Sequence, residues 1–130
     1  MKAYPTSSKG AIIAGRILFV LAVLFLLVDA LMKVAQAEVS VKGSTDLGWP
    51  AEQVQTIGLL LTIFTILYMI PRTAILGAVL ITAYLGGAVA VMLRAGQFNP
   101  FPIVFGIVVW GALYLLDARV RSVIPLRKAE

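Results

Sequence analysis

The chain has 130 residues, of which 61% are hydrophobic and 13% charged, so it is long enough for one domain but far too apolar for an ordinary soluble one. It contains no cysteine and no histidine, which excludes disulfides, thiol redox chemistry and most haem, zinc or iron–sulfur sites formed by this chain alone. The net charge of +5 comes from residues near expected helix ends, not from a basic patch among exposed aromatic residues, which argues against nucleic-acid binding.

The first apolar segment runs from about Ala11 to Met32. It is long enough to cross a bilayer core of ~30 Å, which needs about 20 helical residues. Basic residues before it and the A-x-A pattern Ala35-Gln36-Ala37 after it also resemble a cleavable signal peptide. The charged Asp29 and Lys33 argue against cleavage, so we expect this segment to remain as the first membrane span.

The only sizeable hydrophilic stretch covers residues 34–50. Val39 and Trp49 would suit a brief interfacial helix or ribbon, but Gly43 and Gly48 weaken any regular structure. A short extracytoplasmic loop is therefore at least as well supported as a helix.

Three further spans follow, over about residues 51–70, 73–93 and 101–116. Pro71 separates the second span from the third, and the last span is the shortest. The sequence thus predicts an all-α fold, a single-domain integral membrane protein built as an antiparallel four-helix bundle.

The basic residues predict the orientation of this bundle. Eight of the eleven Lys and Arg residues lie on the side of the termini and of the turn between the second and third spans. By the positive-inside rule, both termini should be cytoplasmic. These eight residues are Lys2, Lys9, Arg16, Arg72, Arg119, Arg121, Arg127 and Lys128.

Ionisable groups inside a span cost several kcal/mol unless they are paired or hydrated, so they are candidate functional residues. Asp29 and Lys33 are one helical turn apart and can form an ion pair. Arg94 ends the third span and should lie at the same depth, because the first and third spans run parallel. We expect an outer cluster of Asp29, Lys33 and Arg94, either as a satisfied structural network or as a site for an anionic or polar ligand.

Tyr84 lies near the middle of the third span, where a phenol needs a hydrogen-bond partner. That partner is either a neighbouring helix or a bound molecule such as a quinone or a sterol-like head group. Thr62, Thr65 and Thr82 have no such need, because threonine can donate to the carbonyl one turn back.

A second layer is expected on the cytoplasmic side, with a charge cluster of Arg16, Arg72, Asp117 and Arg119 and with Tyr68 and Arg121 beside it. These residues are expected to be mainly topology signals and anchors. Asp117 can pair with Arg72 or Arg119, which is a structural role rather than a catalytic one. The sequence predicts no catalytic residue and no metal site.

Small residues recur along the third span and predict close packing. The stripe winds about 160° around the helix, so it should face neighbours on two sides within the bundle. A homodimer contact on this span is the alternative. The packing residues are Ala74, Ala78, Thr82, Gly86 and Ala90, with Gly87 in a second small patch.

Four segments in order resemble the DoxX-like family of small bacterial four-helix membrane proteins: GRILFVLAVLFLLVDALMK, LGWP, YMIPRTAILGAVLITAYLGGAVAVMLR and GALYLLDARVRSVIPLR. The resemblance covers about Gly15 to Arg127 and is most specific from Pro71 to Arg94. It implies a multi-pass protein of the bacterial inner membrane. The name-giving members are membrane subunits linked to a thiosulfate:quinone oxidoreductase, so the resemblance also implies a quinone or membrane oxidoreductase subunits as partners.

From the resemblance we expect a non-catalytic partner, assembly or quinone-associated subunit of a membrane redox system, with no cofactor held by the chain alone. The first alternative is a small-molecule-binding protein or membrane enzyme with an outer-leaflet pocket near Asp29, Tyr84 and Arg94. The second is a small transporter. Homo-oligomerisation stays open.

Overall fold

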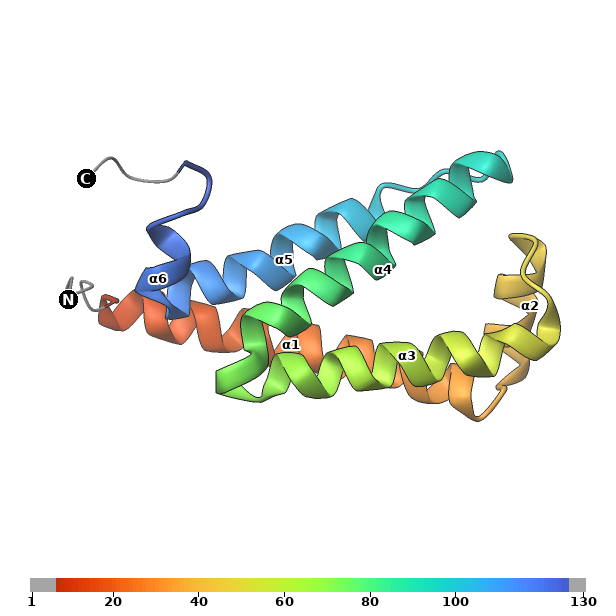
Figure 1. Cartoon of the computed structure of the whole chain (residues 1–130), viewed down its shortest axis with the longest axis horizontal. Helices are drawn as coiled ribbons and strands as arrows, with labels where there is room; N and C mark the ends of the chain where they lie inside the picture. The colour runs from red at the N-terminus through yellow and green to blue at the C-terminus, as the bar shows by residue number, and fades with distance from the viewer. Residues whose placement is uncertain (1–6, 127–130) are drawn as a thin grey trace.

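The computed structural model describes residues 7–126. Three basic residues used to predict the orientation, Lys2, Arg127 and Lys128, lie outside the described residues. The described chain consists of helices joined by short turns (Figure 1). In order these are α1 (Lys9–Val34), α2 (Glu38–Asp46), α3 (Ala51–Met69), the 3-10 helix η1 (Pro71–Thr73), α4 (Ala74–Arg94), α5 (Phe101–Leu116) and α6 (Ala118–Arg121).

Four of these helices coincide with the predicted spans, and the all-α prediction is confirmed. By length and composition, α1, α3 and the continuous η1–α4 segment can each cross a membrane. The fourth, α5, is equally apolar but has 16 residues, about 24 Å of helix, which is shorter than a bilayer core of ~30 Å. By length and composition the chain is therefore a multi-pass membrane protein with three helices long enough to span and a fourth apolar helix, α5, that is shorter.

The four long helices form a ring in which each contacts two neighbours. α1 packs against α3 and α5, and α4 packs against the same two helices. Within residues 7–126, the backbones of the diagonal pairs α1–α4 and α3–α5 stay apart. The bundle thus consists of an α1–α3 layer and an α4–α5 layer, and all neighbouring helices are antiparallel.

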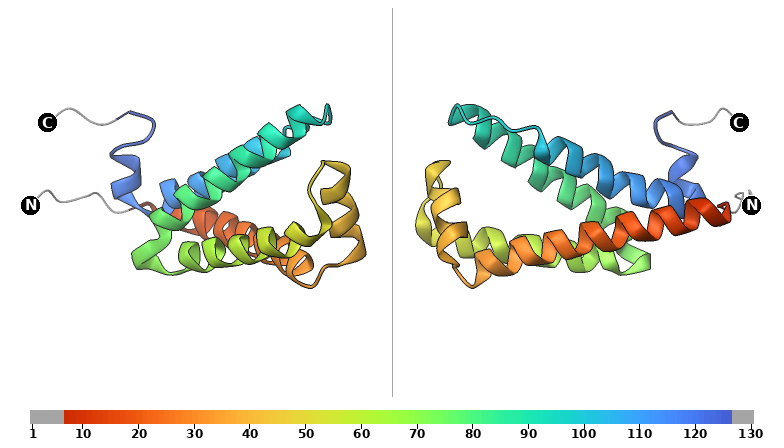
Figure 2. Two further views of the ribbon diagram at one scale, coloured as in Figure 1. Left: turned by 45° about the vertical axis from the view of Figure 1, so that its right-hand side comes forward. Right: turned by 180° about the vertical axis from the view of Figure 1, so that it is seen from behind.

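The two layers meet at the end near the termini and diverge toward the opposite end, where α2 lies (Figures 1 and 2). α2 packs against α1 and α3. Its link to the other layer is a hydrogen bond from Gln97 Nε2, just beyond α4, to the Asp46 carbonyl at 3.3 Å. The bundle is therefore closed at one end and open at the other.

At the closed end, Tyr68 joins the layers. It is fully buried, and its hydroxyl donates to the Val109 carbonyl of α5 at 2.7 Å. Its ring stacks on Phe19 of α1 with 5.0 Å between ring centroids. Tyr68 is therefore a core residue and not an interface anchor. A tyrosine at the end of a span can face inward whenever a carbonyl is within reach of its hydroxyl.

Gly77 allows α4 to touch α3 beside Tyr68. A Cβ atom at residue 77 would overlap the Tyr68 backbone nitrogen and would lie 2.6 Å from the Tyr68 Cα. The next residue, Ala78, is fully buried. Small side chains here let the two backbones come into direct contact.

The C-terminal half of the small-residue stripe does not pack inside the bundle, which corrects the prediction for Gly86, Gly87 and Ala90. All three are exposed, and a Cβ at either glycine would meet nothing within 4 Å. Only the first half, with Ala74 partly buried and Ala78 buried, packs as expected. The reason is the divergence of the layers, which carries this part of α4 away from α1 and α3.

Thr82 marks the middle of the stripe and joins α4 to α5. It is exposed, and its hydroxyl accepts a hydrogen bond from Trp110 Nε1 at 2.7 Å. The same hydroxyl donates to the Ala78 carbonyl at 2.7 Å. The predicted bonds of the other two threonines are also formed, from Thr62 to the Gly58 carbonyl at 2.8 Å and from Thr65 to the Leu61 carbonyl at 2.7 Å.

The hydrophilic stretch between the first two spans contains a helix, so of the helix, ribbon and loop that the sequence allowed, the structure has a helix. α2 has nine residues, with Glu38 in its first turn. A carboxylate there stabilises the helix by its favourable interaction with the positive end of the helix dipole. Gly48, with φ of 97°, lies in the turn that follows. Left-handed backbone of this kind suits glycine and reverses the chain into α3.

Two glycine substitutions on α4 test the closed end against the open end. We expect Gly77→Ala to lower the free energy of unfolding by about 1–3 kcal/mol, because the added methyl group overpacks the contact with Tyr68. Gly86→Ala is the matched control, and we expect it to be neutral or to stabilise by up to about 1 kcal/mol through helix propensity. Denaturant unfolding in detergent, followed by circular dichroism, measures both. Equal destabilisation by the two variants would mean that α4 is packed along its whole length.

Candidate functional site

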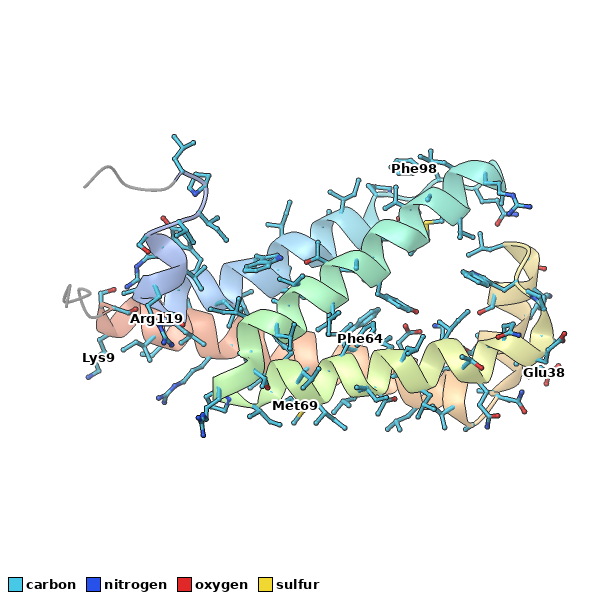
Figure 3. The ribbon with its side chains drawn as sticks, in the orientation of Figure 1. Lys9, Glu38, Phe64, Met69, Phe98 and Arg119 are labelled. Carbon is cyan, nitrogen blue, oxygen red and sulfur yellow. The ribbon has the colours of Figure 1, made fainter. Side chains whose placement is uncertain are left out.

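A cavity of about 670 Å³ lies between the layers at the open end. All four long helices and α2 contribute to its wall. Most of the wall is apolar, and Phe64 extends from α3 into the space between the layers (Figure 3). On the opposite side, Phe25 of α1 packs against Phe101 and Phe105 of α5 with centroid separations of 5.2 Å and 4.8 Å. The wall therefore offers aromatic surface from three helices.

Asp29 and Lys33 form the charged part of the wall. The predicted ion pair is present, with Lys33 Nζ 2.5 Å from Asp29 Oδ1. The side chain of Lys33 is 14% exposed and that of Asp29 is 34% exposed. α3 fixes this pair from behind, because a Cβ at Gly58 would lie only 2.5 Å from the Lys33 Cβ. The close contact between α3 at Gly58 and α1 at Lys33 thus fixes the position of Lys33 beside the cavity.

Tyr84 faces the same cavity from α4. In the described part of the chain, its hydroxyl makes no hydrogen bond to protein, although Asp29 lies within electrostatic range of it. The residue is only partly exposed. Two partners were expected for this phenol, a neighbouring helix or a bound molecule. No neighbouring helix in the described residues supplies one, and the residue lines the cavity.

Arg94 does not join this group, and the predicted cluster of Asp29, Lys33 and Arg94 is not formed. Arg94 is exposed at the end of α4 and is not part of the cavity wall. Equal depth in the membrane was the basis of the prediction, but depth says nothing about lateral separation. α1 and α4 are diagonal helices whose separation is set by the divergence of the layers.

Two serines of α2 complete the polar part of the wall and were not predicted. Ser40 and Ser44 lie one helical turn apart and both line the cavity, and Ser44 is buried. Their four-residue spacing places both serines on one face of a helix. The sequence could not show this, because a helix in this hydrophilic segment was only one of the predicted alternatives. Trp49, just before α3, also lines the cavity.

The second predicted charge cluster, that of Arg16, Arg72, Asp117 and Arg119, forms only in part. Asp117 pairs with Arg119, whose Nε lies 3.1 Å from Asp117 Oδ1. Asp117 also caps α6 by accepting from the Arg119 backbone N–H at 2.9 Å. Arg16 and Arg72 are exposed residues on α1 and η1. Of the two partners predicted for Asp117, the structure therefore has Arg119.

The surroundings of Asp117 lower its pKa below the ordinary value of 3.8. Desolvation by burial alone would raise the pKa, but the hydrogen bonds from the Arg119 side chain and backbone, together with the charges of Arg119 and Arg121, outweigh it. Arg121 also donates to the Tyr114 carbonyl at 2.7 Å. These contacts fix the α5–α6 corner and are structural.

Across residues 7–126 there is no group of three or more acidic, histidine or cysteine side chains that could hold a metal ion. The chemistry that the cavity can offer is hydrogen bonding and apolar contact. Its donors and acceptors are the Tyr84 hydroxyl, the serine hydroxyls and the Asp29–Lys33 pair.

Comparison with known proteins gives one match. A sequence model of the DoxX-like family matches residues 17–112, which confirms the resemblance predicted from the sequence. The match includes most of α1 with Asp29 and Lys33, all of α2 to α4 with Tyr84, and most of α5, and it ends before Asp117. No curated protein and no solved structure matches the chain.

A change of pH tests the Asp117–Arg119 pair. We expect Asp117→Asn to lower the free energy of unfolding by up to about 1 kcal/mol at neutral pH, because it removes an exposed ion pair but keeps a good capping residue. A carboxyl group whose folded pKa is lowered stabilises above its unfolded pKa and loses that contribution as the pH falls through the folded value. The difference between wild type and variant should therefore vanish on acidification below 3.8. Unfolding in detergent across this range is the measurement, and a difference that persists in acid would contradict the assigned role.

Proposed function

The chain belongs to the DoxX-like family, and from the cavity between its helix layers we propose that it binds a small amphipathic molecule taken up from the bilayer. The cavity volume of about 670 Å³ lies within the range of ~300–1,000 Å³ that is typical of ligand pockets. Its wall combines a large apolar surface with a few polar groups, as such pockets usually do. A ligand would place its apolar body against the phenylalanines and its polar end near Asp29, Lys33 and Tyr84.

The observation that carries this proposal is that the Tyr84 hydroxyl faces the cavity without a hydrogen-bond partner among the described residues. A phenol in an apolar environment loses free energy when it has no hydrogen-bond partner. Tyr84 has none among the described residues, yet it faces a cavity rather than lipid alone. A ligand oxygen in that cavity would supply the acceptor.

A quinone is the ligand class that we favour. Its carbonyl oxygens can accept hydrogen bonds from the Tyr84 hydroxyl and from Lys33, and its ring and tail suit a wall containing Phe25, Phe64 and Phe105. In this role the protein is a quinone-associated partner or assembly subunit of a membrane redox system, and a partner oxidoreductase carries out the electron transfer. The family membership supports this assignment by analogy of fold.

We also propose that the protein lies in the bacterial inner membrane with both termini cytoplasmic. Lys9 and Arg119 lie at the end of the molecule that holds the termini, and Glu38 lies at the opposite end (Figure 3). The excess of Lys and Arg at the former end favours the cytoplasm. The cavity then opens in the outer half of the bilayer.

A pair of tyrosine variants tests the ligand site. We expect Tyr84→Phe to weaken binding of a decyl-substituted benzoquinone by about fivefold, the loss of one hydrogen bond. Tyr114→Phe is the control, because Tyr114 is exposed and lies outside the cavity. Quenching of Trp49 fluorescence during titration in detergent is the measurement. Failure of the wild type to bind, or an equal loss in both variants, would refute the proposed site.

A further inference from the structure

The polar end of the cavity carries two opposite charges that cancel. Asp29 and Lys33 are the only charged residues in the cavity wall formed by residues 7–126, and they are bonded to each other. The other polar groups of the wall are neutral hydroxyls, those of Tyr84, Ser40 and Ser44, and the indole of Trp49. The cavity therefore has no net charge to offer a ligand.

The charged residues nearby do not change this balance. Arg94 is exposed at the end of α4 and outside the cavity wall. The charged residues of α2, namely Glu38, Lys42 and Asp46, are exposed and outside the wall as well. Among the described residues, the surrounding helices, including α3 with its exposed Glu52, place no further charged residue in the cavity wall.

An ionised head group would therefore bind at a disadvantage. It would lose its hydration without gaining a counter-charge, or it would take one member of the Asp29–Lys33 pair and leave the other unpaired in an apolar cavity. An uncharged head needs only hydrogen bonds, and the hydroxyls of Tyr84, Ser40 and Ser44 can supply them.

We infer that the Asp29–Lys33 ion pair makes the cavity selective for amphiphiles with an uncharged, hydrogen-bonding head and excludes anionic and cationic amphiphiles with the same tail. This inference rests on the proposed function and narrows its ligand class. The pair acts as a specificity determinant because its charges are matched. Removing one of the two charges should therefore let the cavity accept a head group with the same sign of charge as the side chain that was removed.

Single substitutions of the pair give opposite expected results. Asp29→Asn leaves Lys33 without its partner, so the cavity becomes positive and should accept an anionic head. Lys33→Gln leaves Asp29 unpaired, so the cavity becomes negative and should accept a cationic head. The double variant Asp29→Asn/Lys33→Gln is neutral again and should retain the preference for the uncharged head.

Three brominated alkyl probes with one chain length test these expectations: an alcohol, a sulfonate and a trimethylammonium compound. The two charged heads keep their charge at every pH, so neither can neutralise itself on binding. Bromine quenches tryptophan on contact, and Trp49 lines the cavity. Quenching that the unbrominated alcohol reverses measures binding in the cavity, and the Trp49→Phe variant, which retains Trp110, is the control for quenching from the surrounding detergent.

In the wild type we expect the alcohol to bind at least about tenfold more tightly than either charged probe. Asp29→Asn should gain affinity for the sulfonate and Lys33→Gln for the trimethylammonium probe, each by about fivefold or more. Circular dichroism checks that the variants are folded, and if one is not, the wild-type comparison and the double variant decide the question. Reversible binding of a charged probe as tightly as the alcohol would overturn the inference and leave ligand binding intact. Reversible quenching by none of the probes would overturn both.

Discussion

Tyr68 is the point at which all four spanning helices are held together. Its backbone abuts Gly77 of α4, its hydroxyl donates to the Val109 carbonyl of α5, and its ring stacks on Phe19 of α1. Glycine is required at residue 77 because the two backbones are already in contact there. No comparable contact surrounds Gly86 farther along α4. Because the two layers are in close contact only at this end, they can diverge toward the other end, and the cavity lies between the diverging layers.

The lengths of the helices enlarge the opening. α1 has 26 residues and α5 has 16, so α5 is shorter by roughly 15 Å and leaves the C-terminal end of α1 uncovered. α2 packs beside this end of α1, and a helix suits apolar surroundings because it satisfies its own backbone hydrogen bonds. The serines of α2 and the Asp29–Lys33 pair of α1 then face one apolar space. Paired charges cost less free energy in an apolar environment than single charges do.

Features that depend on one helix were predictable from the sequence, and features that depend on the angle between helices were not. Hydropathy located the fourth span at residues 101–116, which is where α5 lies, and the Asp29–Lys33 pair followed from helical spacing alone. Arg94 was assigned to that pair because depth in the membrane can be counted along the chain, whereas divergence of the layers cannot. The inward turn of Tyr68 and the exposure of Gly86 have the same origin, since both depend on which neighbour each helix meets.

Distances between spin labels on α3 and α4 test the one-ended bundle most directly, and the absence of native cysteine allows labelling without background. One pair, Glu52 and Leu93, lies at the open ends of the two helices, and the other, Ile66 and Ile75, flanks the turn that joins them; all four residues are exposed. In lipid nanodiscs, a bundle fastened at Tyr68 predicts a clearly longer distance for the first pair. Equal distances for the two pairs would contradict it, because α3 and α4 would then lie together along their whole length and leave no room for the cavity.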